Sequence, residues 1–509
     1  MGGTATGSVG FAKSGTGTLE LYDCGTLLTG SISIAQGVVD VRNSNTPFGA
    51  VGSGNFMQVT GNATIGDSNS GTLRFGTVPD AFNSPITYTD SKEIRIEGKG
   101  YNGLGAIATA QDKITTFGGS LVLTGDADVR VGDKTTLDAP TRLDLIGRVD
   151  LAKYTLYHRG PWILRLDGAD LSDSEPESAI RLAASTTVEI DLFGSGGSFS
   201  GQIYGDSGDT TRLLKKGAGS LTAAHIRVGT LTVNDDSTVK ILYSGGTLAG
   251  STLGTSRVTT LALGGSLSTG QVDLTNNDLI IDYSGSSPIG APNTGTQTVA
   301  RWINAGWNNG GWNGTGNAIT TTSGNAGTFA LGYAEAATVL SFSGGTATFS
   351  GQTVDNTSVL VKFTYYGDAT LDGLVSLDDF TVLSDNFGTT GKLWEHGDFN
   401  YDGSVNLTDH TILSANFGSS PQLRGSGGNS GALPPRAYLY IAMLDFPQIY
   451  WESRLDPTTW AMFEPFESMN LGPIPDMPAG FRASIPEPAA AAVAVLALGA
   501  RGRRTRRAV

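Results

Sequence analysis

The chain has little cysteine, little histidine and few charged side chains. Cys24 is the one cysteine among 509 residues, so no disulfide can form within the chain. Stability must come from packing, hydrogen bonds between strands and bound ions. The four histidines include no metal-binding pair, and no nucleophile elbow is present. The sequence therefore nominates no active site.

The charge that is present is mostly acidic. Charged residues make up 16 % of the chain, against about a quarter in an ordinary globular domain. The formal net charge is −14, although five arginines stand in the last nine residues. We expect no nucleic-acid partner for the body, because polyanions bind to basic surfaces.

Glycine is plentiful, with 72 residues, and it separates short stretches in which apolar and polar residues alternate. Such alternation over four to six residues predicts half-buried strands, and Gly, Asn, Asp and Ser between them suit strand reversals. No sustained helical periodicity comes before residue 297. The sequence predicts a mainly β body with strands near 15–21, 30–34, 37–43, 119–123, 126–131, 141–145, 229–233, 260–263 and 278–282.

One strand pattern occurs twice. Lys13-Ser14-Gly15-Thr16-Gly17-Thr18-Leu19 recurs as Lys216-Gly217-Ala218-Gly219-Ser220-Leu221, and a second glycine-led strand follows each copy, at 37–41 and 229–233. This pattern resembles the autotransporter-associated β-strand repeat. The resemblance implies a right-handed parallel β-helix, or solenoid, over residues 1–345, in which each coil buries its inward side chains against its neighbours. A run of β-sandwich domains is the competing architecture.

Two acid-rich loops follow, offset by 30 residues (398 − 368). In each loop, oxygen side chains fall at positions 1, 3, 5, 9 and 12, with glycine at position 6 and a backbone carbonyl expected from position 7. This is the spacing of an EF-hand calcium loop, in which alternate oxygens converge on one ion. An isolated Asx turn is the alternative for one copy but explains two poorly. The predicted ligands of two Ca²⁺ ions are Asp368, Thr370, Asp372, Leu374, Ser376 and Asp379, then Asp398, Asn400, Asp402, Ser404, Asn406 and Asp409.

Each loop runs into an amphipathic stretch, at 379–388 and 409–418, that predicts a helix ending at a left-handed glycine. Tandem calcium loops that have exit helices alone resemble the type I dockerin domain, here a small α unit at 367–418. The resemblance implies docking onto a cohesin-like or other surface protein. Positions 10 and 11 depart from the family's Ser-Thr recognition pair, which puts cohesin binding in doubt. Thr370 at position 3 predicts a weaker first site.

The body contains two further groups of residues that could form a functional site, and each also has a structural explanation. Asp126, Asp128 and Arg130, followed by Asp133 and Lys134, have the residue types of a calcium-assisted polysaccharide lyase, but alternation favours a solvated strand face. Tryptophans flanked by Asn and Gly offer a glycan-stacking platform, although capping the end of a solenoid is the more frequent role of such residues. These tryptophans are Trp302, Trp307 and Trp312, and 298–305 predicts a short helix beside them.

The remaining segments are a linker and a tail. Connecting strands are expected at 346–366, after another at 338–342, and run directly into the first loop, so we expect the loop unit to be fastened to the sheet. Residues 419–484 form a linker and an irregular segment without a clear pattern. Pro486, Glu487 and Pro488, the apolar run 489–500 and the terminal arginines resemble the PEP-CTERM sorting signal at 485–509. That resemblance implies processing by an exosortase-type peptidase.

The tail also predicts an orientation. Positive charge stays cytoplasmic, so the preceding chain is expected outside the cell. A helix of twelve residues reaches about 18 Å, which is short of the roughly 30 Å hydrocarbon layer; membrane association through this hydrophobic segment is therefore expected to be transient. Residues 1–5 lack a secretory signal pattern, and we expect the true start to lie upstream.

Together these patterns predict an exported structural or adhesive protein at the cell surface or outside the cell. The rival class is a polysaccharide-degrading or carbohydrate-binding protein that carries a dockerin-like unit and acts on an extracellular polysaccharide.

Overall fold

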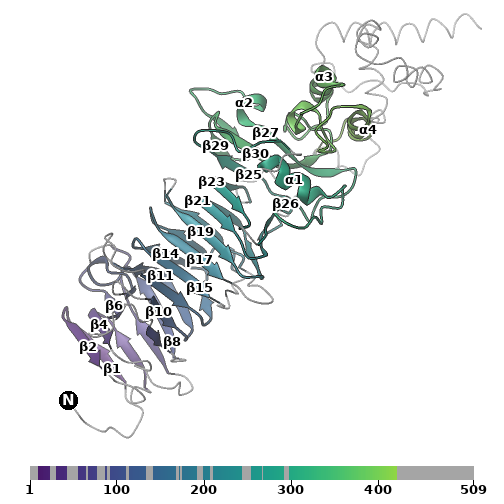
Figure 1. The fold of residues 1–509 in the computed structure, drawn as a ribbon. Helices are drawn as coiled ribbons and strands as arrows, with labels where there is room; N and C mark the ends of the chain where they lie inside the picture. The colour runs from purple at the N-terminus through teal and green to yellow at the C-terminus, as the bar shows by residue number, and fades with distance from the viewer. Residues whose placement is uncertain are drawn as a thin grey trace, which may run out of the picture.

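The computed structural model describes residues 10–22, 30–42, 55–64, 67–76, 86–88, 92–109, 114–132, 141–167, 171, 175–191, 199–206, 210–243, 254–265, 268–291 and 297–420. It has a long body of parallel strands, drawn purple to teal in Figure 1, and a smaller green part at the end of the described chain. The expectation of a mainly β chain with parallel sheets is confirmed.

The body consists of strands that pair in parallel with strands one turn of chain earlier and later. One stack contains β1 (Phe11–Lys13), β3 (Ile32–Ile34), β5 (Phe56–Val59), β8 (Glu93–Gly98), the start of β11 (Leu121–Val131) and β13 (Val149–Asp150). A second contains β2 (Thr18–Tyr22), β4 (Gly37–Arg42), β6 (Gly71–Phe75), β9 (Ile107–Thr109), the end of β11, β14 (Thr155–Arg159), β16 (Ala179–Leu182), β18 (Gln202–Gly205), the start of β21 (His225–Val233), the start of β23 (Ser256–Leu263) and β25 (Leu279–Asp282).

Two further stacks complete the body. The third contains β7 (Ile86–Tyr88), β10 (Ile114–Phe117), β12 (Arg142–Leu145), β15 (Ile163–Asp167), β17 (Thr187–Asp191), β19 (Arg212–Lys216) and the ends of β21 and β23. The fourth contains β20 (Ser220–Ala223), β22 (Ser237–Ile241), β24 (Gly270–Asp273) and β26 (Ala318–Thr320). A 3-10 turn, η1 (Tyr101–Gly103), precedes β9.

Aligned inward side chains make the core. Leu156 pairs with Ile180, Ile180 with Ile203 and Ile203 with Ile226, and all four are fully buried. Burying a side chain of this size contributes roughly 1.5–3 kcal/mol, so each added strand extends one continuous apolar column.

The repeated lysine motif forms a lysine-braced turn. Lys13 Nζ donates to the carbonyl oxygens of Gly15 and, at 3.0 Å, Gln36. In the second copy, Lys215 Nζ donates at 2.9 Å to Gly217 and also to the Lys216 carbonyl. The matching lysine is therefore Lys215, and the repeat begins one residue earlier than the sequence pattern predicts. Gly37 is required beside the first turn, because a Cβ there would lie 2.4 Å from the Gly15 oxygen.

Lys215→Met is expected to reduce the free energy of unfolding of the body by about 1–3 kcal/mol, because two turn carbonyls lose their donor. Burial also lowers the pKa of Lys215 to about 8. Lys216→Met is the matched control, since Lys216 is partly exposed and makes a 3.5 Å ion pair with Glu189 that contributes little. Thermal unfolding measures the difference, and equal melting temperatures for the two variants would show that the turn does not depend on Lys215.

The second stack ends at β25, and the last parallel strand of the body is β26, so the parallel order ends before residue 345. β25 pairs antiparallel with β30 (Ser358–Tyr365), which also pairs antiparallel with β27 (Phe329–Glu335). Around these strands lie α1 (Val299–Trp307), α2 (Ala336–Val339) and the hairpin of β28 (Ala347–Phe349) and β29 (Gln352–Val354). The strand expected at 338–342 is wrong, since α2 occupies its start and residues 340–342 belong to no strand. The final elements are α3 (Leu377–Asn386), the 3-10 turn η2 (Trp394–His396) and α4 (Leu407–Asn416).

Candidate functional site: two acidic loops

The two acidic loops have the same structure at equivalent positions. The carboxylate of Asp368 accepts hydrogen bonds from the amides of Asp372 (3.1 Å) and Gly373 (2.9 Å). Asp398 accepts the equivalent bonds from Asp402 and Gly403 at the same two distances. The first acid of each loop therefore ties down the turn that follows it.

The last acid of each loop closes it. Asp379 accepts from the amides of Thr370 (3.0 Å) and Ser376 (2.8 Å). Asp409 accepts from Asn400 (3.2 Å) and Asn406 (3.0 Å) in the same way, and from Phe399 (2.8 Å). One oxygen of each acid holds the loop while the other caps the helix.

The helices begin two residues before the predicted positions because of capping. The Ser376 side chain accepts from the Asp378 amide at 3.1 Å and forms a capping box with Asp379. Asn406 does the same with Thr408 and Asp409. These boxes satisfy amides at each helix start, so α3 and α4 begin at Leu377 and Leu407.

Positive φ angles appear where the loop pattern requires them. Gly373 and Gly403, at position 6, have φ of 90° and 85°. Gly388 and Gly418, past the ends of the helices, have φ of 76° and 80°, as expected for left-handed C-terminal caps. Leu371 and Tyr401, at position 4, also have positive φ, which the loop pattern does not predict.

Backbone hydrogen bonds join the two halves crosswise. The amide of Gly388, after α3, donates to Val405 of the second loop at 2.8 Å, and Gly418, after α4, donates to Val375 of the first loop at 2.8 Å. Each loop therefore pairs with the segment that follows the other helix. The two loops and helices form one loop–helix unit, residues 367–418.

The acids at positions 1 and 12 are buried with few compensating charges. Asp368, Asp379, Asp398 and Asp409 all have 0 % exposure. Burial raises the pKa of Asp398 to about 8 and that of Asp409 to about 6, and in the first loop burial together with the charge of Asp379 raises the pKa of Asp368. Buried carboxylates of this kind require protons or a cation.

The donor set fits a hard divalent cation. Each loop brings carboxylates, a hydroxyl or amide oxygen and backbone carbonyls to one turn, which are the ligands that Ca²⁺ prefers. Asp372 and Asp402, at position 5, remain exposed at the mouth of each loop. Among the described residues, no group of three or more His, Cys, Asp or Glu side chains is gathered as a finished metal site. Hydroxyl, amide and backbone oxygens would therefore have to supply part of any coordination shell.

Two partners of the first loop were not predicted from the sequence. Lys362 Nζ donates to the Leu371 carbonyl at 2.8 Å, and its charge lowers the pKa values of Asp368 and Asp372 against the larger effect of burial. The Thr364 hydroxyl donates to Asp368. Both residues lie on β30, so the strand before the loop supplies part of its environment.

The loop–helix unit packs against the antiparallel strands through an aromatic cluster of Trp307, Trp312, Tyr333, Tyr366, Trp394, Phe399 and Tyr401. Tyr401 is fully buried, and its ring centroid lies 5.3 Å from that of Trp307 and 5.4 Å from that of Trp394. Its hydroxyl donates to the Leu331 carbonyl on β27 at 3.0 Å. Trp394 Nε1 donates to the Asp368 carbonyl at 2.6 Å, which links the cluster to the first loop.

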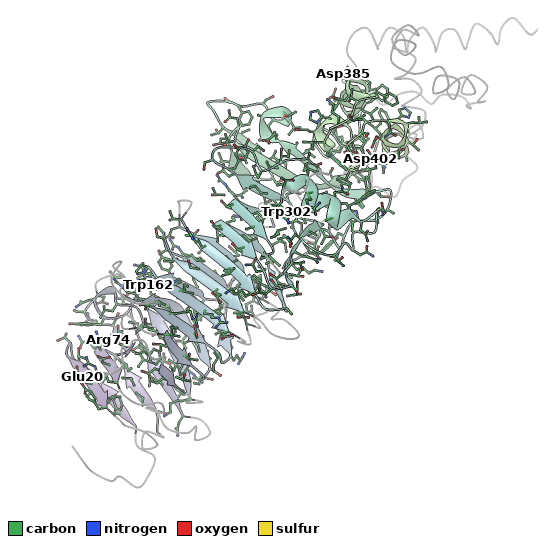
Figure 2. The ribbon with its side chains drawn as sticks, in the orientation of Figure 1. Glu20, Arg74, Trp162, Trp302, Asp385 and Asp402 are labelled. Atoms are coloured by element: carbon green, nitrogen blue, oxygen red, sulfur yellow. The ribbon has the colours of Figure 1, made fainter. Side chains whose placement is uncertain are left out.

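The three tryptophans considered for glycan stacking lie in or beside this interface. Trp302 and Trp312 are each 4 % exposed, and Trp307 Nε1 donates to the Tyr366 hydroxyl at 2.7 Å. Figure 2 shows Trp302 where the parallel body meets the C-terminal part, with Asp402 and Asp385 further out on the loop–helix unit. Stacking on a sugar requires an open ring face, and the burial of Trp302 and Trp312 does not provide one.

The acids and bases considered for lyase chemistry are divided in the structure. Asp126 is exposed, Arg130 is half-buried and Asp128 is buried, in a 2.7 Å ion pair with Arg159. Burial raises the pKa of Asp128 to about 6. Asp133 and Lys134 lie outside the described residues, as do Cys24, Pro486, Glu487, Pro488 and the hydrophobic run 489–500. Among the described helices, none is long and apolar enough to cross a membrane.

Comparison of the chain with protein families, with curated proteins and with solved structures gave no match. The function of the chain is therefore inferred from its own geometry and sequence patterns.

In protein freed of divalent ions by a chelator, the melting temperature is expected to fall as the pH rises from 6.5 to 8.5. A carboxylic acid whose pKa is higher in the folded state than in the unfolded state stabilises the fold while it is protonated. This stabilisation is complete below the pKa of the unfolded state and is lost as the pH rises through the pKa of the folded state, which is about 8 for Asp398. Each such group contributes up to about 1.4 kcal/mol per pH unit. Buried His158 and His410, with pKa values lowered to about 4, act below this window.

Asp398→Asn is the control for this pH series, because an amide cannot ionise. The variant is expected to show a shallower decline of melting temperature. A flat profile for the parent protein, or the same slope in the variant, would contradict the assignment.

Proposed function

We propose that this protein is an exported bacterial surface protein with a structural or adhesive role. Its body is a right-handed parallel β-helix, and its loop–helix unit binds two Ca²⁺ ions and holds the C-terminal end of that body in place. The observation that supports this proposal most directly is the pair of matched loops, each with two fully buried aspartates. Calcium would neutralise these carboxylates, and the aromatic cluster would transmit that order to β27.

The export part of the proposal depends on the resemblance of residues 485–509 to a PEP-CTERM signal, with an exosortase-type peptidase as the processing partner. Calcium is abundant outside cells, which agrees with the use of weak acidic loops. Docking to a cohesin-like or other surface protein is also part of the proposal. Asp378 and Thr408, at position 11 of the two loops, are exposed and leave the helix starts accessible.

Calorimetric titration with CaCl₂ tests the metal assignment. We expect two bound ions, with the loop of Asp398 tighter than the loop of Asp368, because Lys362 lies beside the first loop and Thr370 is a poorer ligand than Asn400. Asp402→Ala is expected to remove the tighter event.

Lys362→Met is expected to strengthen the weaker event about tenfold, or about 1.4 kcal/mol, because a nearby positive charge is removed. Lys240→Met is the matched control, since Lys240 lies on β22 in a 3.1 Å ion pair with Asp273. Absence of any calcium-dependent heat in the parent protein, at several temperatures, would reject the proposed function of the unit.

A further inference from the structure

Lys362 on β30 lies between the end of the body and the first acidic loop. In the antiparallel ladder of β25 and β30, Leu279 is opposite Val361 (Figure 1). The same register, carried one residue further, sets Asp278 opposite Lys362 on one face of the sheet, where the Cβ atoms of such a pair are about 4.5–5.5 Å apart. The ammonium group of Lys362 also reaches the loop, since it donates to the Leu371 carbonyl at 2.8 Å.

Asp278 is an anchor that joins three segments at the end of the body. Its carboxylate accepts a hydrogen bond from the Phe363 amide on β30 at 3.0 Å and another from the hydroxyl of Ser350. Ser350 lies in the turn of the β28–β29 hairpin, and its carbonyl accepts from the Thr255 hydroxyl at 3.2 Å. The body, the hairpin and β30 therefore meet at one buried side chain.

The negative charge of Asp278 is not neutralised by a direct ion pair. Asp278 is 1 % exposed, and both hydrogen bonds to its carboxylate come from neutral groups. In the described part of the chain, no basic nitrogen lies within 4.0 Å of this carboxylate. Burial raises the pKa of Asp278 to about 6, and the charge of Lys362 is the largest effect that opposes this. Lys362 is therefore the main counter-charge of the anchor.

Lys362 has the same relation to acids of the first loop. Its charge lowers the pKa values of Asp368 and Asp372 against the larger effect of burial. One ammonium group thus serves buried carboxylates on both sides of the junction, Asp278 in the body and Asp368 in the loop. A calcium ion in the loop would bring two positive charges to Asp368 and would repel the nearby ammonium group.

We propose that Lys362 is a shared counter-ion that couples calcium binding in the first loop to the Asp278 anchor. Its ammonium group has two positions within reach, the Leu371 carbonyl of the loop and the carboxylate of its cross-strand neighbour Asp278. Calcium in the loop favours the second position, which stabilises the anchor and the hairpin attached to it. The coupling is reciprocal, so Asp278 in turn strengthens calcium binding. This inference rests on the proposed function, because it requires calcium in the loop.

Hydrogen exchange of the full chain, measured by mass spectrometry in CaCl₂ and in EDTA, tests the coupling at the β28–β29 hairpin, residues 347–354. We expect calcium to slow exchange in the hairpin of the parent about fivefold, which is a usual size for coupling between two sites. In Lys362→Met, calcium still binds but exchange in the hairpin no longer responds to it. Lys240→Met is the control on β22 and should respond as the parent does.

Calorimetric titration gives a second measurement of the same coupling. Asp278→Asn removes the charge and keeps the size of the side chain, so it is expected to weaken the weaker calcium event about fivefold. In the Lys362→Met background the same substitution should have an effect of less than about twofold, because the residue that links the two sites is gone. Asp355→Asn is the matched control, since Asp355 follows the same hairpin and its carboxylate accepts from the Thr357 amide at 2.8 Å.

Three results would overturn the coupling and leave the calcium assignment intact. They are binding of two ions with no change of exchange in the hairpin, an equal response to calcium in Lys362→Met, and an equal effect of Asp278→Asn in both backgrounds. Absence of calcium-dependent heat in the parent rejects the proposed function and the coupling together. The exchange measurement needs only the parent and the lysine variants, so it decides the matter even where Asp278→Asn does not fold.

Discussion

Removing calcium with EDTA is expected to lower the melting temperature of the loop–helix unit by about 10 °C or more. Each of the two proposed sites would contribute about 2.7 kcal/mol when free calcium is 100 times its dissociation constant, and both would act on a unit of small size. Without the ions, four buried aspartates carry uncompensated charge or bind protons. Hydrogen exchange measured by mass spectrometry would follow the loss at residues 367–418 separately from the body.

Asp398→Asn separates loss of the ion from loss of the fold. In EDTA the variant should have a melting temperature at least as high as that of the parent, because one buried charge is gone. When calcium is added, its melting temperature should rise by less than that of the parent. Asp385→Asn is the matched control, since Asp385 is exposed on α3, outside both loops (Figure 2). A parent protein with the same exchange profile in calcium and in EDTA would contradict the expectation.

Tyr401→Ala is expected to destabilise the attachment of the loop–helix unit by about 3–5 kcal/mol, as large-to-small changes of buried aromatic residues do. The ring contacts Trp307, Trp312, Tyr333 and Trp394, and its hydroxyl donates to Leu331. The measurable result is faster proteolysis between β30 and α3 and a red-shifted tryptophan emission, because buried indoles become wet.

Tyr401→Phe keeps the ring and removes one hydrogen bond, so it should cost only about 1 kcal/mol. If Tyr401→Ala and Tyr401→Phe had the same small effect on stability, the aromatic cluster would not hold the loop–helix unit to β27. Neither substitution alters a side chain with an expected ligand oxygen, so calcium binding by the phenylalanine variant serves as an internal check.

Local chemistry made the acidic loops and their turns predictable. Spacing alone located Asp368, Asp379, Asp398 and Asp409, and glycine at position 6 predicted the positive φ of Gly373 and Gly403. The predicted starts of α3 and α4 were two residues too late, because the sequence pattern treats Ser376 and Asn406 only as ligands. Their side chains also cap the helices, which therefore begin at the next residue.

Long-range pairing made the rest unpredictable. Alternation predicts that Tyr157 and Arg181 point outward, but only the register between β14 and β16 makes them neighbours. The contact of Lys362 with the first loop and the burial of Tyr401 likewise depend on where β27 and β30 lie. Lys215 could be identified as the lysine that matches Lys13 only from the position of its amino group, which the sequence motif does not give.

The antiparallel pairing of β30 with β25 has a consequence for self-association. A stack of parallel strands can be extended without limit by any further strand that copies its direction, including one from another molecule. β30 already occupies that edge and runs the opposite way, with β27 beyond it. Addition of a like strand onto β25 is therefore closed off at the second stack, because β30 already holds the hydrogen-bonding edge that such a strand would need.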